Sequence, residues 1–436
     1  MMRLVFASSL ALLAPAVAAA EDAGDLLAGA AELDRAAMVS EVLARNPSLT
    51  AARSALRAAE ERPAQASALA DPMLSWGVAP ESLGSSTVDF GQELELGQEL
   101  PYPGKRRLRG DLAAAEAEAS RQDVESLRLE LAMRASLLFD DYYQVHRALA
   151  INAEHVALLE DFQRVATARY AAGLAAQQDP LQAEVELAHL LHDGVILGSE
   201  REIVVAEINA LLHRTPGASL PPPPAELAPP ARGTVEEAGL EEQALAARPA
   251  LRALDEMVRA RQAEVELARL EGRPDFGVMS SYNSMWSDSE HRFMVGAGIN
   301  LPIWRTRVRA GIAEAEARLA AAQSEREALV DEIRREVRTA GQRLGEAHHI
   351  LELYESRMLP AASDQVQAAL SGFRTGRNDF LALIEAERSL RTFKLGYHEA
   401  IASLYRHRAE LDRAVGRLPL EATAPALAPS SAGENR

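Results

Sequence analysis

The chain has 436 residues and a formal net charge of −18, and 48% of its residues are hydrophobic although only 5% are aromatic. This acidity argues against nucleic acid as a partner, because an acidic surface repels phosphate groups. The absence of cysteine excludes disulfides, thiolate metal sites and a lipid anchor on an N-terminal cysteine. Many small apolar residues and few aromatic ones are typical of helices packed through alanine.

The first 20 residues predict a secretory signal peptide. Arg3 precedes an apolar run at residues 4–17, and three alanines end the segment before Glu21. A positive start, a short apolar stretch and small residues at its end indicate cleavage after Ala20. No later run reaches 18 apolar residues, so the sequence predicts no transmembrane helix in the mature chain. Entry into a membrane would then require a closed β-barrel.

Beyond a lead-in at 21–46, the first half of the chain predicts helices and strands in a fixed order. A helix kinked by proline is followed by two strands, a long helix, a tight turn and a second helix. In residue numbers these elements are 47–70, 73–78, 87–100, 105–170 and 179–213, with a short helix at 33–44 before them. Polarity alternates along the second strand, so its acidic side chains share one face: Asp89, Glu93, Glu95 and Glu99.

A later stretch, 305–373, is the longest run without a strand signal, and its sustained seam predicts a helix. Its apolar residues from Ile333 to Tyr354 alternate steps of four and three, the heptad spacing of a helix that packs along one stripe. As a single helix this stretch would be roughly 100 Å long at 1.5 Å per residue. The sequence therefore predicts a protein that bridges a distance.

The same order of elements recurs about 202 residues further along the chain. Punctuating residues recur at this separation in four places: Pro47 and Pro249, Pro72 and Pro274, Pro101 and Pro302, Gly173 and Gly376. We interpret this as a tandem duplication, with a second strand pair at 276–286 and 291–301. The predicted domains are a first repeat at 47–214, a Pro-rich linker and short helix at 215–247, a second repeat at 248–416 and a disordered tail at 417–436.

The four predicted strands suit a membrane, because each is long enough to cross a bilayer at a tilt. Four strands cannot close a barrel, so we expect a homotrimer with twelve strands. Its apolar face would contact lipid and its acidic face would line water. Aromatic residues lie in or beside the strands, where a membrane belt is expected: Trp76, Tyr282, Trp286 and Trp304. The alternative is an amphipathic sheet packed on a soluble core.

Paired motifs in the two repeats resemble those of the TolC family of outer-membrane efflux proteins. They are Asn46-Pro47 and Arg248-Pro249, Asp71-Pro72 and Arg273-Pro274, the tips 170–174 and 373–377, and the segments 181–184 and 383–387. The resemblance covers the mature chain apart from both tails. It implies a mainly α fold with a trimeric 12-stranded β-barrel in the outer membrane of a Gram-negative bacterium. A long α-helical coiled-coil tunnel would extend into the periplasm.

The resemblance also implies a function, that of the exit duct of a tripartite efflux system. Such a duct docks a periplasmic adaptor, or membrane fusion protein, and an inner-membrane pump, and it needs no cofactor. The segment 98–107 resembles the branch that serves heavy-metal pumps, and drug efflux or type I secretion stays open as an alternative. The rival from another class is a soluble periplasmic coiled-coil scaffold or adaptor, which would need a compact β domain beside a single hairpin.

Three sets of site residues are predicted. In a trimer the acidic strand face forms rings that favour cations. The helix tips reach farthest from the membrane, so we expect them to dock the adaptor: Gly173, Leu174, Gly376 and Arg377. Charge is confined to the second tip, whose counterpart in the family lines the periplasmic constriction. The resemblance therefore implies a gate held by charge pairs among Arg374, Arg377, Asp379 and Glu385.

The sequence contains no catalytic constellation and no phosphate loop. His189 and His192 with Asp193, and the pair His348-His349, have spacings that could suit a metal. Histidines on solvated helices are more often polar surface, so we predict neither a metal site nor an enzyme.

Overall fold

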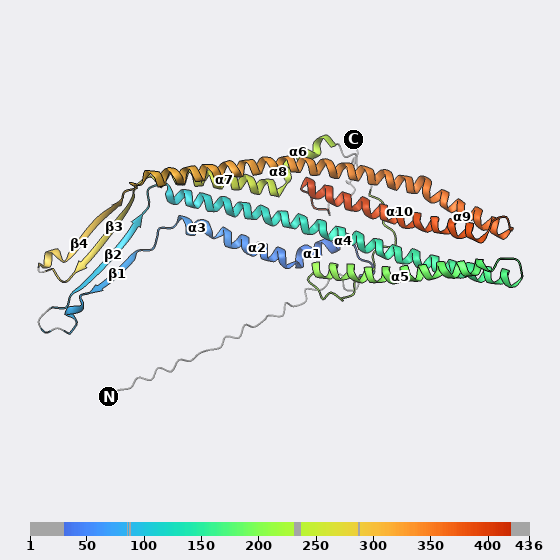
Figure 1. The fold of residues 1–436 in the computed structure, drawn as a ribbon. Coiled ribbons are helices and arrows are strands. Elements are labelled where there is room, and N and C mark those ends of the chain that lie inside the picture. Colours follow the sequence, from blue (N-terminus) through green and yellow to red (C-terminus); the bar gives the residue numbers. More distant parts are fainter. Residues whose placement is uncertain (1–29, 85, 87–88, 231–236, 287, 420–436) are drawn as a thin grey trace, which may run out of the picture.

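The computed structural model describes residues 30–419 except 85, 87–88, 231–236 and 287. The molecule is a long rod (Figure 1). A four-stranded sheet forms one end, two helical hairpins end in tight turns at the other, and long helices run between them. The predicted signal peptide at 1–20 and the tail beyond 419 lie outside the described residues. Among the residues described, no helix is both long and apolar enough to cross a bilayer.

Capping residues and prolines set several of the helix ends. The helices are α1 (Arg35–Arg45), α2 (Pro47–Glu60), α3 (Arg62–Ser67), α4 (Lys105–Ala171), α5 (Gln178–Leu211), α6 (Glu237–Ala247), α7 (Pro249–Leu270), α8 (Arg305–Leu353), α9 (Leu359–Arg374) and α10 (Phe380–Val415). Asn46 caps α2, because its side chain accepts a hydrogen bond from the Ser48 N–H at 3.0 Å. Pro63 lies at the start of α3, so the predicted kink is a break between α2 and α3.

The long helix of the second repeat is interrupted, and the prediction of one continuous helix at 305–373 is wrong in this respect. A π-helical turn, η3 (Tyr354–Met358), separates α8 from α9. Pro360 has no N–H to donate to the carbonyl four residues earlier, so a regular α ladder cannot pass this point. The ring of Tyr354 lies against Gly396 of α10, where a Cβ would collide with it. By contrast, α4 runs through its 67 residues without a break.

The heptad seam predicted for this helix is confirmed. Six of its residues are buried: Ile333, Val337, Ala340, Leu344, Ala347 and Leu351. They share an apolar cluster with Ile401 and Leu404 of α10. A second cluster surrounds the middle of α4, and a third lies near the hairpin turns. The rod is therefore held by apolar clusters spread along its length.

The sheet joins the two repeats edge to edge. Its strands are β1 (Met73–Val78), β2 (Gln92–Leu100), β3 (Asp275–Asn283) and β4 (Phe293–Asn300), in that order and all antiparallel. One row across the four strands is apolar: Trp76, Leu94, Tyr282 and Phe293. The next row, on the opposite face, is polar or flexible: Ser75, Glu95, Ser281 and Met294. The predicted apolar face therefore extends across all four strands, whereas the acidic side chains Glu93, Glu95 and Glu99 of the opposite face lie on β2.

The predicted strand at 87–100 is shorter in the structure, where β2 begins at Gln92. Gln92 pairs with Val78, the last residue of β1, and Pro80 then starts the 3₁₀ turn η1 (Pro80–Ser82). Residues 89–91 therefore have no described strand beside them on that edge, and residues 87–88 of the predicted strand lie outside the described part of the chain. Asp89 lies in the preceding loop, so strand alternation does not place it on the acidic face, which retains Glu93, Glu95 and Glu99.

The predicted linker at 215–247 is bound to the rod along its described part and does not act as a free spacer. Pro222 O accepts a hydrogen bond from Leu33 N at 2.8 Å, and Pro221 O accepts one from Tyr142 Oη at 3.1 Å. Further on, Ala228 O accepts a hydrogen bond from Tyr405 Oη at 2.7 Å. The linker thus bonds to α4 and α10, one long helix from each repeat.

Candidate functional site

The two hairpin turns at the far end of the rod have the same backbone structure. Gly173 and Gly376 have φ of 72° and 73°, in the left-handed region that favours glycine. In each turn an N–H reaches back five residues at 2.8 Å, from Leu174 to Arg169 O and from Arg377 to Gly372 O. This is the glycine-terminated helix end known as the Schellman motif. No atom lies within 4 Å of a Cβ built on either glycine, so conformation and not space requires glycine there.

The predicted gate residues do not pair with one another within the subunit. Asp379 caps α10, because its Oδ1 accepts a hydrogen bond from Ala382 N at 2.9 Å. Glu385 accepts a hydrogen bond from Arg388 Nη1 at 2.7 Å. Within the described part of the chain, Arg374 and Arg377 form no ion pair. Pairing of these arginines with a neighbouring subunit stays a prediction.

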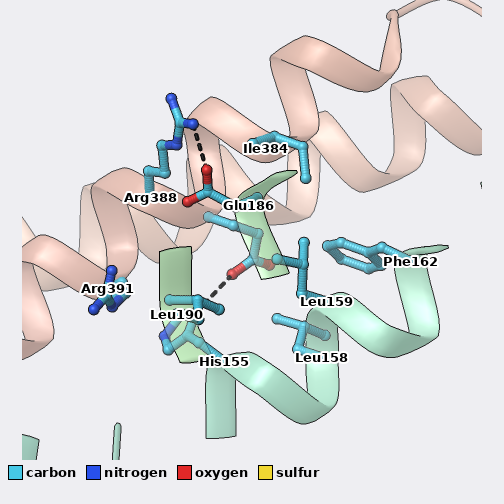
Figure 2. A pocket seen from close by; sticks show the side chains of 10 residues that line it. His155, Leu158, Leu159, Phe162, Glu186, Leu190, Ile384, Arg388 and Arg391 are labelled. Atoms are coloured by element: carbon cyan, nitrogen blue, oxygen red, sulfur yellow. Dashed lines mark hydrogen bonds and ion pairs between the residues drawn. The ribbon is translucent and has the colours of Figure 1, made fainter. Parts of the chain in front are cut away.

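Other cations of α10, just beyond the turn, join the two hairpins. We call this contact the interhairpin seam, in which α10 residues meet acids of α4 and α5: Arg388, Arg391 and Lys394 with Glu186, Asp193 and Glu154. Figure 2 shows Arg388 of α10 reaching the carboxylate of Glu186. Glu186 is only 8% exposed, so this partner compensates a carboxylate that water reaches poorly.

The two remaining pairs of the seam are short. Arg391 Nη2 lies 2.6 Å from Asp193 Oδ2, and Lys394 Nζ lies 2.7 Å from Glu154 Oε1. The cations are three residues apart on α10, which places them along one face of the helix. Arg388 and Glu186 lie on α10 and α5, the helices that follow the hairpin turn in the two repeats. The turn glycines are 203 residues apart, so Arg388 corresponds to Val185, and comparison of the repeats does not reveal this pairing.

Behind these ion pairs lies a buried polar contact. His155 Nδ1 is 3.8 Å from Glu387 Oε2, beside Leu159 and Phe162 in the pocket of Figure 2. Burial lowers the pKa of His155 to about 4, and the positive charge of Lys394 lowers it further in the same direction. Burial also raises the pKa of Glu387. Both shifts favour the uncharged forms, so we treat this contact as polar and not as a formed ion pair.

The buried contact is incompletely bonded. His155 Nε2 and Glu387 Oε2 are buried and have no hydrogen-bond partner among the described residues. Unsatisfied buried polar atoms cost free energy, so this part of the interface resists separation less than a fully bonded one would. The seam therefore combines ion pairs that close it with a buried contact that favours opening.

Arg169 of α4 makes one more tie between the hairpins, directly at the turns. Its Nη1 donates to Phe373 O at 2.9 Å, and its guanidinium carbon lies 4.6 Å from the centre of the Phe373 ring. This contact links the first hairpin to the start of the charged turn. Sequence analysis missed it, because the partner is a backbone oxygen.

The acidic sheet face lies at the opposite end of the rod. Glu93, Glu95 and Glu99 face the same side as Met279, whose side chain lies over Gly296. The candidate metal residues lie elsewhere: His192 Nδ1 is 3.9 Å from Asp193 Oδ1, Asp193 is engaged by Arg391, and no three metal-ligating side chains meet among the residues that the structure describes. The sheet provides an acidic surface, and the interhairpin seam is a contact between helices that can separate. These features suit a channel more than an enzyme.

Comparison with known proteins shows which family the chain resembles. The model of the family "Outer membrane efflux protein" matches residues 38–196 and 240–417. The cobalt-zinc-cadmium resistance protein CzcC of Cupriavidus metallidurans is 24% identical over 394 residues, which cover 87% of this chain and 89% of CzcC.

Solved structures of channels have the same fold. CusC matches with a TM-score of 0.76 at 17% identity, over 88% of this chain and 92% of CusC. The open-state MtrE outer-membrane channel of Neisseria gonorrhoeae matches with a TM-score of 0.73 at 18% identity, over 88% of this chain and 89% of MtrE. These matches confirm the resemblance read from the paired motifs. Since the family model covers well over half of its length, the chain belongs to the outer membrane efflux protein family and is an efflux channel of the outer membrane with a periplasmic helical extension.

Proposed function

We propose that this channel is the exit duct through which a tripartite pump exports divalent metal cations, working as a homotrimer with a periplasmic adaptor and an inner-membrane pump. The observation that carries the proposal is the division of the sheet into an acidic and an apolar face. Two strands from each repeat form the apolar face, and the three glutamates of the acidic face lie on β2. The cobalt-zinc-cadmium resistance of the relative CzcC supports the choice of cargo.

The trimer follows from surfaces that a single subunit leaves uncovered. Both edge strands, β1 and β4, have one unpaired side, and the apolar side chains of the sheet are exposed, Val295 at 75%. Unpaired backbone is costly in lipid, so three copies would close a twelve-stranded sheet. An exposed apolar stripe on α5 would be covered in the same assembly: Leu181, Val185, Val195 and Ile203.

In such a trimer the acidic face would line the water-filled interior. Glu93, Glu95 and Glu99 would each recur three times around the axis, which favours cations and repels anions. Changing all three to glutamine should therefore shift the reversal potential of the open channel, measured in planar bilayers under a salt gradient, toward zero. The matched control changes the same residues to aspartate, which keeps the charges. Equal reversal potentials for parent and glutamine variant would contradict the assignment of cation cargo to this face.

The hairpin turns are the proposed docking site for the adaptor. They lie at the end of the rod opposite the sheet (Figure 1), and Leu174 is 70% exposed beside the left-handed Gly173. Leu174→Asp should abolish metal resistance of cells, because a charge there prevents an apolar contact, while Leu174→Met should preserve it. Trimer content and membrane insertion should stay at the parent level in both variants. Full resistance in the aspartate variant would place adaptor docking elsewhere.

A further inference from the structure

Arginines are concentrated at the junction between sheet and helices, although the chain as a whole is acidic. Both long helices begin with basic residues directly after a strand, α4 after β2 and α8 after β4. We call these exposed residues the arginine belt: Arg106, Arg107, Arg305, Arg307 and Arg309. The end of α7 lies between the two helix starts, with Gly272 next to Val308 and Leu270 next to Gly104. The belt therefore occupies one level of the rod.

On α4, Arg107 pairs with Asp111 at 2.7 Å and Arg106 donates to Ser67 O at 2.7 Å, but stability of the helix does not explain the part of the belt on α8. Neither α4 nor α8 has an acidic residue in its first turn, although negative charge is what the start of a helix favours. Among the described residues, Arg305, Arg307 and Arg309 form no ion pair. Arginines further along α8 do, for example Arg318 with Glu264 at 2.6 Å and Arg326 with Asp255 at 2.5 Å. The arginines at the start of α8 thus have no acidic partner among the described residues, whereas Arg318 and Arg326 on the same helix do.

The neighbours of the belt are apolar and exposed. Ile303 and Trp304, the two residues before α8, are 69% and 72% exposed, and Leu301, just past the end of β4, is 61% exposed. Tryptophan above a row of arginines is the order of side chains found where a protein leaves hydrocarbon and enters the headgroup layer. The arginine guanidinium also binds phosphate through two parallel hydrogen bonds.

We propose that the arginine belt binds the phosphate groups of phospholipids in the periplasmic leaflet of the outer membrane and thereby sets the depth of the channel. This inference rests on the proposed placement of the sheet in the membrane. The occupant is a lipid and not a free anion, because the cations adjoin an exposed apolar band that only an acyl chain would cover. The belt would hold headgroups at the level where each chain passes from strand to helix.

The test measures lipids retained by the purified channel in detergent, counted by native mass spectrometry. Parent protein is incubated with phosphatidylglycerol or with a diacylglycerol of the same chains, which lacks the phosphate. Parent protein should retain phosphatidylglycerol in preference, and changing Arg305, Arg307 and Arg309 together to glutamine should lower this retention about tenfold. The lysine triple variant should keep most of it. A control with the same change of charge on the same helix, Arg318, Arg334 and Arg335 to glutamine, should match the parent.

Three outcomes would overturn the proposal. Equal retention of the two lipids by parent protein would do so without any variant. Displacement of the lipid by excess inorganic phosphate, but not by chloride, would indicate a site for free anions. A changed reversal potential with unchanged lipid retention in the glutamine variant would place these arginines in the pore. The same spectra report subunit number, so failure of the proposed trimer would be seen separately.

Discussion

Changing Arg388 and Arg391 to glutamine should open the periplasmic end of the channel. These two cations hold α10 to Glu186 and Asp193 of the first hairpin. Both pairs are partly exposed, so each contributes about 1 kcal/mol after screening by solvent. In the proposed trimer, two pairs in each of three subunits would sum to about 6 kcal/mol, and about 5.5 kcal/mol suffices to invert a two-state equilibrium from 1:99 to 99:1. Loss of the pairs also leaves Glu186 buried without its cation, which further favours separation.

The expected result is a several-fold higher single-channel conductance in planar bilayers and greater sensitivity of cells to large antibiotics. The control is the double variant Arg374→Gln and Arg377→Gln, which removes the same charge at the turn where no ion pair forms within the subunit. If the turn variant opens the channel and the seam variant does not, the constriction is held between neighbouring subunits by the predicted gate residues. Parent conductance in both variants would mean that neither set holds the closed state.

Lys105→Met should destabilise the channel more than the loss of any exposed ion pair. Lys105 is 1% exposed, and its Nζ donates to both carboxylate oxygens of Asp275 at 2.9 Å and to Arg273 O at 3.3 Å. Asp275 also accepts a hydrogen bond from Tyr102 N at 2.7 Å. This contact fastens the turn after β2 to the first residue of β3, so it joins the two repeats where sheet meets helix. Removing one partner of a buried pair costs about 3 kcal/mol.

The measurement is the midpoint of guanidinium-induced unfolding in detergent, together with the amount of channel in the outer membrane. Arg121→Gln is the matched control, because Arg121 and Glu60 form an exposed pair at 2.9 Å that contributes well under about 1 kcal/mol. The double variant Lys105→Met with Asp275→Asn should lose less stability than the sum of its single changes, since the two groups interact. Equal midpoints for Lys105→Met and Arg121→Gln would show that the buried lysine does not hold the junction.

Local and periodic features of the fold could be predicted from the sequence. The heptad seam of α8, the break at Pro63 and the glycine turns at Gly173 and Gly376 depend on residues within one element. The two faces of the sheet depend on alternation alone, and the register confirms them. The helix cap formed by Asp379 was also readable, since an acidic residue followed three positions later by a free helical N–H is a capping signal. Asp379 therefore has a partner within its own chain, and its role as a gate charge stays a prediction.

The tertiary structure decided the features that depend on how separate helices and strands face one another. The start of β2 at Gln92 depends on where β1 ends beside it, and the pairing of Arg388 with Glu186 depends on the rotation of α10 against α5. The periodicity of a helix defines which residues share a face, but it leaves open which face of the neighbouring helix they meet. The burial of Lys105 has the same origin, because its partner lies 170 residues away in the second repeat and is brought close only when the two repeats share one sheet.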